Sequence, residues 1–406
     1  MDLLDRISLD DTWTEFYEYK IAQGNMSCKE ADELRAYIDN RRYEAIVDSI
    51  INESYEIPVP VRCEINKLNS SKKRIVYTYP YDFSNVLKII AYCLHVYDNC
   101  FANGCLAFRR DRSFKSVIGT LKEKSKESRL YAIKTDISNY FNSIDVDILC
   151  GELSEVLVHD KRLFAFCERM LRADKAFDTA RGCEVCEKRG AMAGIPVASF
   201  FANVYLRKLD REFEKRGILY YRYSDDILIM TRDEKSLNEI RSELYDRLRE
   251  YGLEINVSKE DIIVGKKPID FLGLSILDGE VDLSFATKEK LKGKIKRKAK
   301  SIRRWCDKKS VSYEKGAKVL IKSMNRKFYS VEDDDFSWSR WFFPVITTSQ
   351  GLKQIDAYMQ DYVRFCITGR HNKGNYRIRY SELKKLGYIS LVNKWYGYKR
   401  TGKYEN

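Results

Sequence analysis

The sequence of 406 residues lacks the features that mark membrane and secreted proteins. It contains no apolar stretch of the roughly 18 residues that a membrane-spanning helix needs. Its first twenty residues are acidic and do not show the basic-then-apolar pattern of a signal peptide. The eleven cysteines are scattered and odd in number, unlike the framework of a disulfide-rich domain. These absences predict a cytoplasmic protein with reduced thiols and no membrane partner.

A sulfur-ligated metal site and repeated modules are also missing. Cys183 and Cys186 form the one CxxC pair, and no second pair stands nearby to complete the four ligands of a structural zinc site. We therefore expect an ordinary loop at these two cysteines. No internal repeat, low-complexity tract or obvious flexible linker interrupts the chain.

Positive charge is in excess, with a net charge of +13 and a pI near 9.0. Such an excess indicates a polyanionic partner. It is concentrated in residues 287–309, where Ile295, Ala299 and Ile302 also recur at helical spacing. This pattern predicts a basic amphipathic helix, which is either a solvated surface helix or a nucleic-acid contact. We favour the contact because aromatic and basic residues continue to the C-terminus.

Strand-like and helical patterns alternate through residues 59–285, which predicts one α/β or α+β domain. Residues 1–55 have helical patterns, and the chain after residue 285 is helical and basic. Between these regions we expect strands at 59–79, 130–138, 218–224 and 225–230, helices at 84–100, 145–158, 160–173, 197–215 and 233–252, and short strands that end near residue 277.

The segment YRYSDDILIM, residues 221–230, places Asp225 and Asp226 side by side in an apolar, strand-forming run. Burying two like charges that cannot pair is costly. A lone pair of aspartates is usually a capped or solvated turn, but the flanking β-branched and aromatic residues favour a metal site. Magnesium prefers carboxylate oxygens, and phosphoryl transfer by two metals needs at least one more carboxylate. Asp136, in the strand-like segment 130–138, meets this need.

Seven segments resemble, in order, the motifs of reverse transcriptases. They are SSKKRIVY (70–77), CLAFRRDRSF (105–114), DISNYF (136–141), GIPVASFFANVYL (194–206), YSDD (223–226), GLEINVSKE (252–260) and FLGLSI (271–276). YSDD is similar to the YxDD box of that family, and DISNYF resembles its first catalytic motif. The resemblance implies an α+β fold of the right-hand polymerase type, with fingers, palm and thumb between helical N-terminal and C-terminal extensions.

The resemblance also implies domain boundaries along the chain. We expect a helical N-terminal extension at 1–58, fingers at 59–128, a palm at 129–285 with a fingers insertion at about 145–193, a thumb at 286–330, and a helical basic C-terminal region at 331–406. At the start of this last region, the acidic segment 331–338 is expected to be an exposed loop.

Matched to the family's motifs, Asp136, Asp225 and Asp226 are the expected catalytic residues. They would hold two Mg²⁺ ions, with Mn²⁺ as an alternative, and the backbone carbonyl of Ile137 would be a further ligand. Asp226 would act either as a ligand or by setting the local charge. The ions would activate the 3′-hydroxyl of the primer and steady charge on the phosphates of the nucleotide.

The family's nucleotide-binding positions fall on five residues of this sequence. Lys73 and Arg74 would clamp the β- and γ-phosphates, unless they form only a basic hairpin tip. Lys259 would lie near the leaving pyrophosphate, or else be an exposed lysine. Phe141 would exclude the 2′-hydroxyl of a ribonucleotide, or else be a core aromatic. Pro196 would line the nucleotide site as part of the glycine-proline motif.

Nucleic acid would contact two basic segments and the tail. Arg109 and Arg112 belong to the segment that is similar to GFRxxRS of bacterial reverse transcriptases, and the helix at 287–309 occupies the thumb position. The expected contacts of that helix are Lys294, Lys296, Arg297, Lys298, Arg303 and Arg304. The tail from Tyr376 onward mixes arginine, lysine and tyrosine, which suits the stacking of bases. The expected partners are an RNA template, by preference a structured noncoding RNA, a DNA product and dNTPs, with an oligomer left open.

The glycine-proline motif departs from the family's usual GxPQGxxxSP pattern. Val197, Ala198 and Ser199 follow Pro196, so the glutamine that normally touches the incoming nucleotide is missing. This departure is more similar to the defence-associated bacterial reverse transcriptases, including the abortive-infection class, than to group II intron or retroviral enzymes. The sequence also shows no HNH endonuclease pattern, no RNase H spacing of acids and no VTG box in the thumb.

The function implied by the resemblance is an RNA-directed DNA polymerase that uses two Mg²⁺ ions, acts in antiphage defence and copies an associated noncoding RNA into cDNA. One alternative is a retron-type reverse transcriptase. Others are a template-independent, protein-primed DNA polymerase of the abortive-infection type and a catalytically idle RNA-binding protein. The intact carboxylates of Asp136, Asp225 and Asp226 argue against an idle protein.

Overall fold

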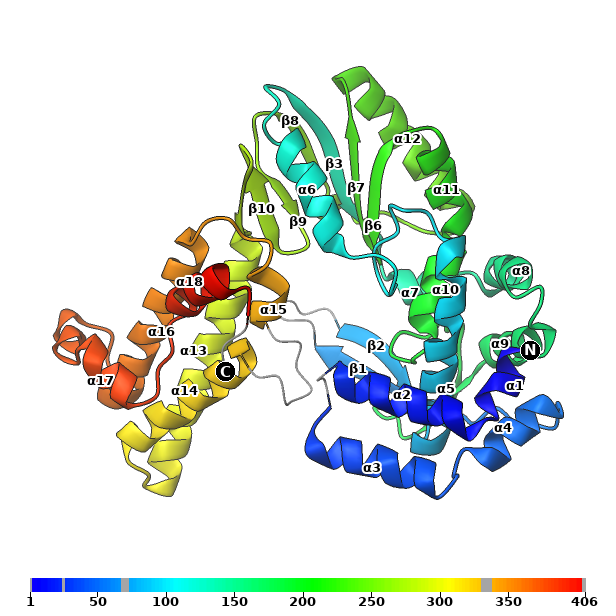
Figure 1. The fold of residues 1–406 in the computed structure, drawn as a ribbon, viewed down its shortest axis with the longest axis horizontal. Helices are drawn as coiled ribbons and strands as arrows, with labels where there is room; N and C mark the ends of the chain where they lie inside the picture. The colour runs from blue at the N-terminus through cyan, green and yellow to red at the C-terminus, as the bar shows by residue number, and fades with distance from the viewer. Residues whose placement is uncertain (1, 24–25, 67–72, 330–337, 404–406) are drawn as a thin grey trace. The chain divides into compact units, whose positions relative to one another are not determined.

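A computed structural model describes residues 2–23, 26–66, 73–329 and 338–403 of the chain, which divides into two compact units (Figure 1). The first unit comprises residues 1–22, 29–116 and 129–265, and the second comprises residues 23–28, 117–128 and 266–406. Helices and sheets are both present, which confirms the predicted α+β class. Residues 67–72, which include the start of the segment SSKKRIVY, and residues 330–337, which include most of the acidic segment 331–338, lie outside the described residues.

The N-terminal region is helical, as predicted. It contains α1 (Leu3–Ile7), α2 (Asp10–Ala22), α3 (Cys28–Asp39) and α4 (Glu44–Ile51). Trp13 is fully buried, and its ring stacks on that of Tyr43 at 4.1 Å. The predicted buried helix is α5 (Tyr81–Cys93), followed by the 3₁₀ helix η1 (Leu94–Cys100), and both α1 and α4 pack against α5.

Four strands of the first unit form a sheet in the order β2-β1-β4-β5. β1 (Val61–Asn66) and β2 (Lys73–Thr78) pair as an antiparallel hairpin, and β4 (Lys175–Asp178) lies parallel to β1. β5 (Cys183–Cys186) pairs with β4 along its whole length, so the CxxC segment is a strand and the expectation of an ordinary loop is wrong. Both of its cysteines are exposed.

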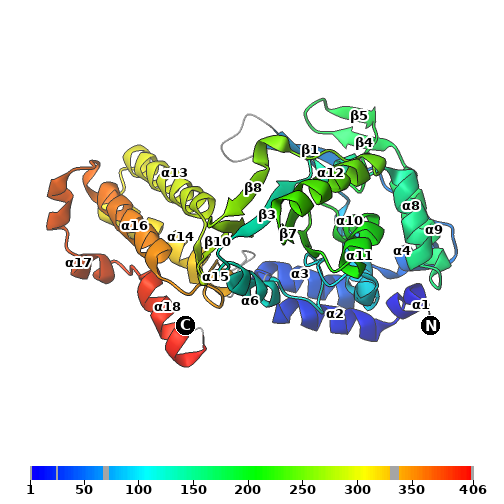
Figure 2. The same ribbon diagram turned by 90° about the horizontal axis from the view of Figure 1, so that it is seen from above.

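A second sheet of the first unit carries the acidic residues. Its strands are β6 (Leu219–Tyr223), β7 (Asp226–Thr231), β3 (Leu130–Asp136) and β8 (Asp261–Gly265), antiparallel throughout and in that order (Figure 1). Figure 2 shows β7, β3 and β8 from above. Residues 227–230 of β7 are all buried, so this strand is covered on both faces. This explains why its sequence is continuously apolar instead of alternating. α12 (Glu234–Glu250) packs on β3 and β7, and its N-cap Asp233 accepts from the amide of Ser236.

Helices connect these strands. After β3 come α7 (Tyr140–Ser143), α8 (Val146–Val156) and α9 (Lys161–Arg172). The single helix predicted at 197–215 is two helices, α10 (Ala198–Tyr205) and α11 (Arg207–Lys215), which are separated at Leu206. α11 packs against β6, and the short 3₁₀ helix η2 (Val257–Lys259) leads into β8.

The second unit combines a small sheet with helices. It contains β9 (Ile269–Phe271), β10 (Leu274–Leu277), β11 (Glu280–Leu283), α13 (Phe285–Lys309), α14 (Tyr313–Tyr329), α15 (Trp338–Phe342), α16 (Gln350–Thr368), η3 (Lys373–Arg377), α17 (Tyr380–Lys385) and α18 (Leu391–Thr401), together with most of α6 (Phe114–Lys124). The apolar stripe of α13, which includes Ile295, Ala299 and Ile302, is buried, so the predicted amphipathic helix is confirmed.

Buried polar contacts hold the helices of the second unit in place. α13, α14 and α16 pack on one another, and the carboxylate of Asp282 in β11 accepts from the amide of Gly351 in α16. The buried carboxylate of Asp356 accepts from the hydroxyls of Tyr388 and Ser390 and from the amide of Leu391 at the start of α18. Among the helices in the described part of the chain, none combines the length and hydrophobicity that crossing a bilayer requires.

Candidate active site

The two adjacent aspartates lie at a tight turn between β6 and β7. Tyr223 pairs with Asp226 in the antiparallel register, so Ser224 and Asp225 are the two residues of the turn. Ser224 has a φ of 60°, a backbone conformation that favours glycine at this position of a hairpin. Such a residue stores about 1–3 kcal/mol of strain and is held only where the surroundings enforce it. The carbonyl of Asp225 accepts from the amide of Ile137 at 3.0 Å, which ties the turn to the end of β3.

The third predicted carboxylate reaches the same place through the sheet register. Asp136 ends β3 and lies directly opposite Asp226. Burial and the charges of Asp136 and Asp226 raise the pKa of Asp225 to about 6. Burial also raises the pKa of Asp226, against the lowering effect of the Lys134 charge, and Asp136 adds to the rise. The structure therefore brings together the three acids that the sequence places 89 and 90 residues apart.

Lys259 lies beside Asp136, with its side chain 58% exposed, and its expected place near the leaving pyrophosphate stays a prediction. Its ammonium nitrogen is 2.5 Å from Oδ2 of Asp136. The segment before it runs beside the end of β3, because Ser138 donates to the carbonyl of Glu254 and Asn256 donates to the carbonyl of Asp136. This backbone pairing, and not the lysine itself, decides that the ammonium faces the site.

The three carboxylates have the chemistry that a divalent cation needs, but their side chains are not oriented around a common metal position. Carboxylate oxygens are the ligands that Mg²⁺ and Mn²⁺ prefer. In the described residues, no three Asp, Glu, His or Cys side chains are arranged to hold a metal ion as they stand. The carboxylate of Asp136 is neutralised by Lys259 instead. A cation that binds Asp136 would therefore replace the lysine as its counter-charge.

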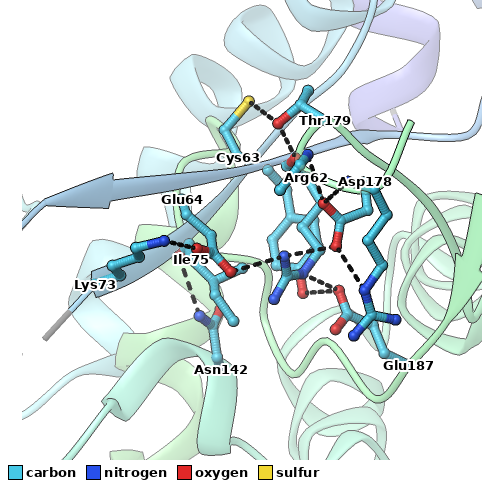
Figure 3. Close-up of polar contacts among 12 residues, drawn as sticks. Arg62, Cys63, Glu64, Lys73, Ile75, Asn142, Asp178, Thr179 and Glu187 are labelled. Carbon is cyan, nitrogen blue, oxygen red and sulfur yellow. Dashed lines mark hydrogen bonds and ion pairs between the residues drawn. The ribbon is translucent and has the colours of Figure 1, made fainter. Parts of the chain in front are cut away.

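The predicted triphosphate-binding residues, Lys73 and Arg74, lie on β2 of the first sheet. Figure 3 shows Lys73 at the start of this strand. Lys73 pairs with Glu64 of the neighbouring strand at 2.8 Å, and Arg74 is exposed. Glu64 is contacted in turn by Arg62, which also pairs with Asp178 and Glu187 (Figure 3). Glu64 was not predicted from the sequence, because a single glutamate in a charged hairpin carries no signal of its own.

Asn142 connects the parts of the predicted nucleotide site and was also missed. Its Nδ2 donates to the carbonyl of Ile75 in β2 at 3.2 Å (Figure 3), and its Oδ1 accepts from the amide of Ala193 at 3.1 Å. It follows Phe141, which is partly exposed and packs edge-on against Tyr140. Its position next to the aromatic residue of DISNYF is the only sequence signal that could have pointed to it.

The backbone of the glycine-proline segment packs closely against β2. The amide of Tyr77 donates to the carbonyl of Ala193 at 2.8 Å. Gly194 has a φ of 108°, and a Cβ there would lie 2.8 Å from the carbonyl oxygen of Tyr77. Only glycine fits this approach. Pro196 is partly exposed, and Val197, at the position of the family's glutamine, is fully buried.

Arg109 differs from its expected role as a nucleic-acid contact. Its side chain is only 2% exposed and pairs with Asp111. It also donates to the carbonyls of Ala102 and Cys105. These contacts stabilise the loop that carries Arg109, so its guanidinium binds groups of the protein itself. Arg112 of the same segment is exposed, and its guanidinium bonds to the side chain of Asn103.

The basic residues of α13 separate into two groups within the second unit. Lys296, Arg297, Lys298 and Arg304 are exposed, and Lys294 is partly exposed. Arg303 instead donates to the carbonyls of Phe365 and Cys366 near the end of α16, and its guanidinium lies 3.8 Å from the ring centroid of Tyr313. Its guanidinium is therefore engaged within the second unit, in place of the expected nucleic-acid contact. In the tail, Tyr376 is 69% exposed.

Carboxylates at the ends of paired strands can hold the metal ions that phosphoryl transfer uses. The family model described as "Reverse transcriptase (RNA-dependent DNA polymerase)" matches residues 65–276, just over half of the chain. The chain therefore belongs to the reverse transcriptase family. Its domain is that of an RNA-directed DNA polymerase, a nucleotidyltransferase, and such domains generally use divalent metal ions.

Solved structures of telomerases are also similar to this chain. One is telomerase from Candida albicans in complex with a TWJ fragment of telomeric RNA, at 14% identity and a TM-score of 0.46, over 88% of this chain and 71% of that one. Another is apo telomerase from Candida tropicalis truncated from its C-terminal domain, at 15% identity and a TM-score of 0.43. The match covers 55% of this chain and 55% of the length of that telomerase. A comparison with curated proteins finds no match.

Proposed function

We propose that this chain is a Mg²⁺-dependent reverse transcriptase that acts in the cytoplasm in antiphage defence and copies a structured noncoding RNA into cDNA. One observation carries the catalytic part of the proposal. Asp136 and Asp226 lie opposite each other in the sheet register, and Asp225 lies on the adjoining turn. Three carboxylates at the ends of paired strands repel one another, and a divalent cation removes that repulsion.

Asp136, Asp225 and the carbonyl of Ile137 would hold the ions, with Asp226 as a further ligand or a source of local charge. When bound, the ions supply activation of the primer hydroxyl and stabilisation of phosphate charge. Lys259, released from Asp136, would then face the charge of the leaving pyrophosphate. Lys73 would exchange Glu64 for the phosphates of the incoming nucleotide in the same way.

The defence role rests on the altered glycine-proline segment. Val197 occupies the position of the family's glutamine and is fully buried. This position therefore offers no polar side chain to the incoming nucleotide. This supports the resemblance to defence-associated reverse transcriptases. It equally favours the second candidate, a template-independent and protein-primed polymerase, because the residue that normally touches the incoming nucleotide is absent. Tyr376, which is 69% exposed, carries one hydroxyl that such priming could use.

The test of the catalytic proposal is the double variant Asp225→Ala with Asp226→Ala. It should fold, lose nucleotide incorporation on a primed RNA template, and lose protection of cells against phage. Removal of two mutually repelling charges should not destabilise the folded protein. Unfolding would therefore not explain the loss of incorporation. Asp246→Ala with Asp233→Asn removes two acids of the same unit outside the site and serves as the control. Wild-type incorporation by the double variant would refute the site.

The template is tested by sequencing the nucleic acid that co-purifies with the protein. One structured RNA should dominate, and truncation after about Tyr376 should lose that RNA while nonspecific binding remains. Nuclease treatment followed by intact-mass measurement separates the second candidate. Nucleotides that remain attached to a tyrosine would replace the RNA-primed proposal with protein priming.

A further inference from the structure

A fully buried ion pair lies directly behind the turn that carries Asp225. Arg222 of β6 and Asp210 of α11 are both 0% exposed at their side chains. The contact is bidentate, with Nε of Arg222 at 2.9 Å from Oδ1 and Nη2 at 2.5 Å from Oδ2 of Asp210. The hydroxyl of Tyr220 donates to the same carboxylate at 2.8 Å. The charge of the guanidinium is therefore fully compensated where it lies.

The third arm of the guanidinium reaches the turn itself. Nη1 of Arg222 donates to the carbonyl of Ser224 at 3.2 Å. The next carbonyl, that of Asp225, accepts from the amide of Ile137. Both carbonyls of the two-residue turn are thus bound, one by Arg222 and one by the end of β3. Ser224 is the residue with the strained φ of 60°, so these bonds hold a backbone that would otherwise relax.

The surroundings leave Arg222 no other position. Its amide donates to the carbonyl of Gly104, and its carbonyl accepts from the amide of Leu106, so the segment before Arg109 pairs with this edge of the sheet. A Cβ at Gly104 would lie 2.1 Å from the carbonyl oxygen of Tyr220, which shows how closely the two backbones approach. Cys105, from the same segment, accepts from Nη2 at 3.5 Å.

We propose that Arg222, oriented by Asp210, is a positioning residue that holds the Ser224–Asp225 turn in the conformation that presents the Asp225 carboxylate to the metal. The inference rests on the proposed function, because it assigns Arg222 and Asp210 a part in the same reaction. An arginine suits this position because its planar fork can bond a carboxylate with two arms and a carbonyl with the third. A lysine ammonium can neutralise Asp210 but has no rigid fork with which to reach Ser224.

The test separates support of the turn from support of the fold. In the double variant Asp210→Leu with Arg222→Met, apolar side chains of similar size replace the buried pair, an exchange that is often neutral for stability. We expect near-native circular dichroism and melting temperature, a kcat at least tenfold lower on a primed RNA template, and a smaller change in the KM for dNTP. The affinity for Mn²⁺ alone, measured by the loss of the free-ion electron paramagnetic resonance signal, should fall by a similar factor.

The matched control is Glu152→Leu with Arg207→Met. This pair also involves α11, and its side chains are 8% and 11% exposed. It should leave kcat and Mn²⁺ binding unchanged. Wild-type kcat and Mn²⁺ affinity in the folded Asp210→Leu, Arg222→Met variant would overturn the proposal.

If that double variant does not fold, Arg222→Lys decides, because it keeps Asp210 paired. It should retain the fold and lose kcat and Mn²⁺ affinity at least tenfold, and full retention of both would refute the positioning role. A wild-type protein without polymerase activity would refute the proposed function alone, since Mn²⁺ binding of the same variants still reports on the turn.

Discussion

Asp225→Asn should stabilise the metal-free protein at neutral pH, because the turn holds a carboxylate that resists ionisation. Its pKa of about 6 in the folded protein lies above the ordinary value of 3.8, as a result of burial and the charges of Asp136 and Asp226. Between these two values the folded protein binds a proton that the unfolded chain does not. The contribution of Asp225 to stability should therefore rise as the pH falls from 7 through 6 towards 4, and the difference between the wild type and Asp225→Asn isolates this contribution.

The magnitude follows from the size of the shift. A difference of about two pKa units, at 1.36 kcal/mol per unit, corresponds to about 3 kcal/mol of destabilisation at pH 7.5 when metal is absent. Asparagine has the shape of aspartate without its charge and escapes this penalty. The variant should thus be more stable than the wild type by up to about 3 kcal/mol at pH 7.5, and the two should converge near pH 4.

The assay is a urea titration in EDTA. Hydrogen exchange at the amides of β3 and β7 monitors the unfolding of the first unit. Saturating Mg²⁺ should stabilise the wild type more than Asp225→Asn, because the metal takes over the repelling charge. Asp246→Asn, an exposed carboxylate paired with Arg249, is the control and should change stability by less than about 0.5 kcal/mol. Equal stability of wild type and Asp225→Asn at both pH values would refute the reasoning.

Three further predictions concern the nucleotide and the nucleic acid. Phe141→Ala should reduce the preference for dNTPs over rNTPs by about ten- to hundredfold, measured by side-by-side incorporation, and an unchanged preference would leave Phe141 a packing residue. Glu64→Gln should lower the KM for dNTP by roughly two- to fivefold, because it frees Lys73 from a weak, solvent-screened ion pair; an unchanged KM in steady-state kinetics would separate Lys73 from the triphosphate. Neutralising the exposed cations of α13 should weaken binding to all nucleic acids. The slope of log K against log salt concentration should become shallower by about three to four, whereas Arg303→Gln should lower the melting temperature without changing that slope. The exposed cations are Lys296, Arg297, Lys298 and Arg304.

The sequence by itself determined most of the helices and strands around the site and the acids that it contains. An apolar run interrupted by two aspartates predicts a buried strand pair with a functional turn, and the structure places Asp225 and Asp226 there. The amphipathic pattern of α13 was equally readable, because hydrophobic periodicity is a local property of the chain. The break at Leu206 and the strand at Cys183–Cys186 were not predicted, since both depend on what packs beside them. The boundaries of fingers, palm and thumb stay predictions.

Only the tertiary structure decided which charges face the site and which are used elsewhere. Lys259 and Asp136 are 123 residues apart in the chain, and the pairing of Ser138 and Asn256 with their neighbours is what brings them together. In the sequence, Arg109 and Arg303 cannot be distinguished from the exposed arginines near them. In the structure, their guanidiniums bind carbonyls of the protein. Arg222 is likewise buried, in an ion pair with Asp210. An arginine side chain is long enough to be either a surface charge or a buried brace, and long-range packing determines which role it takes.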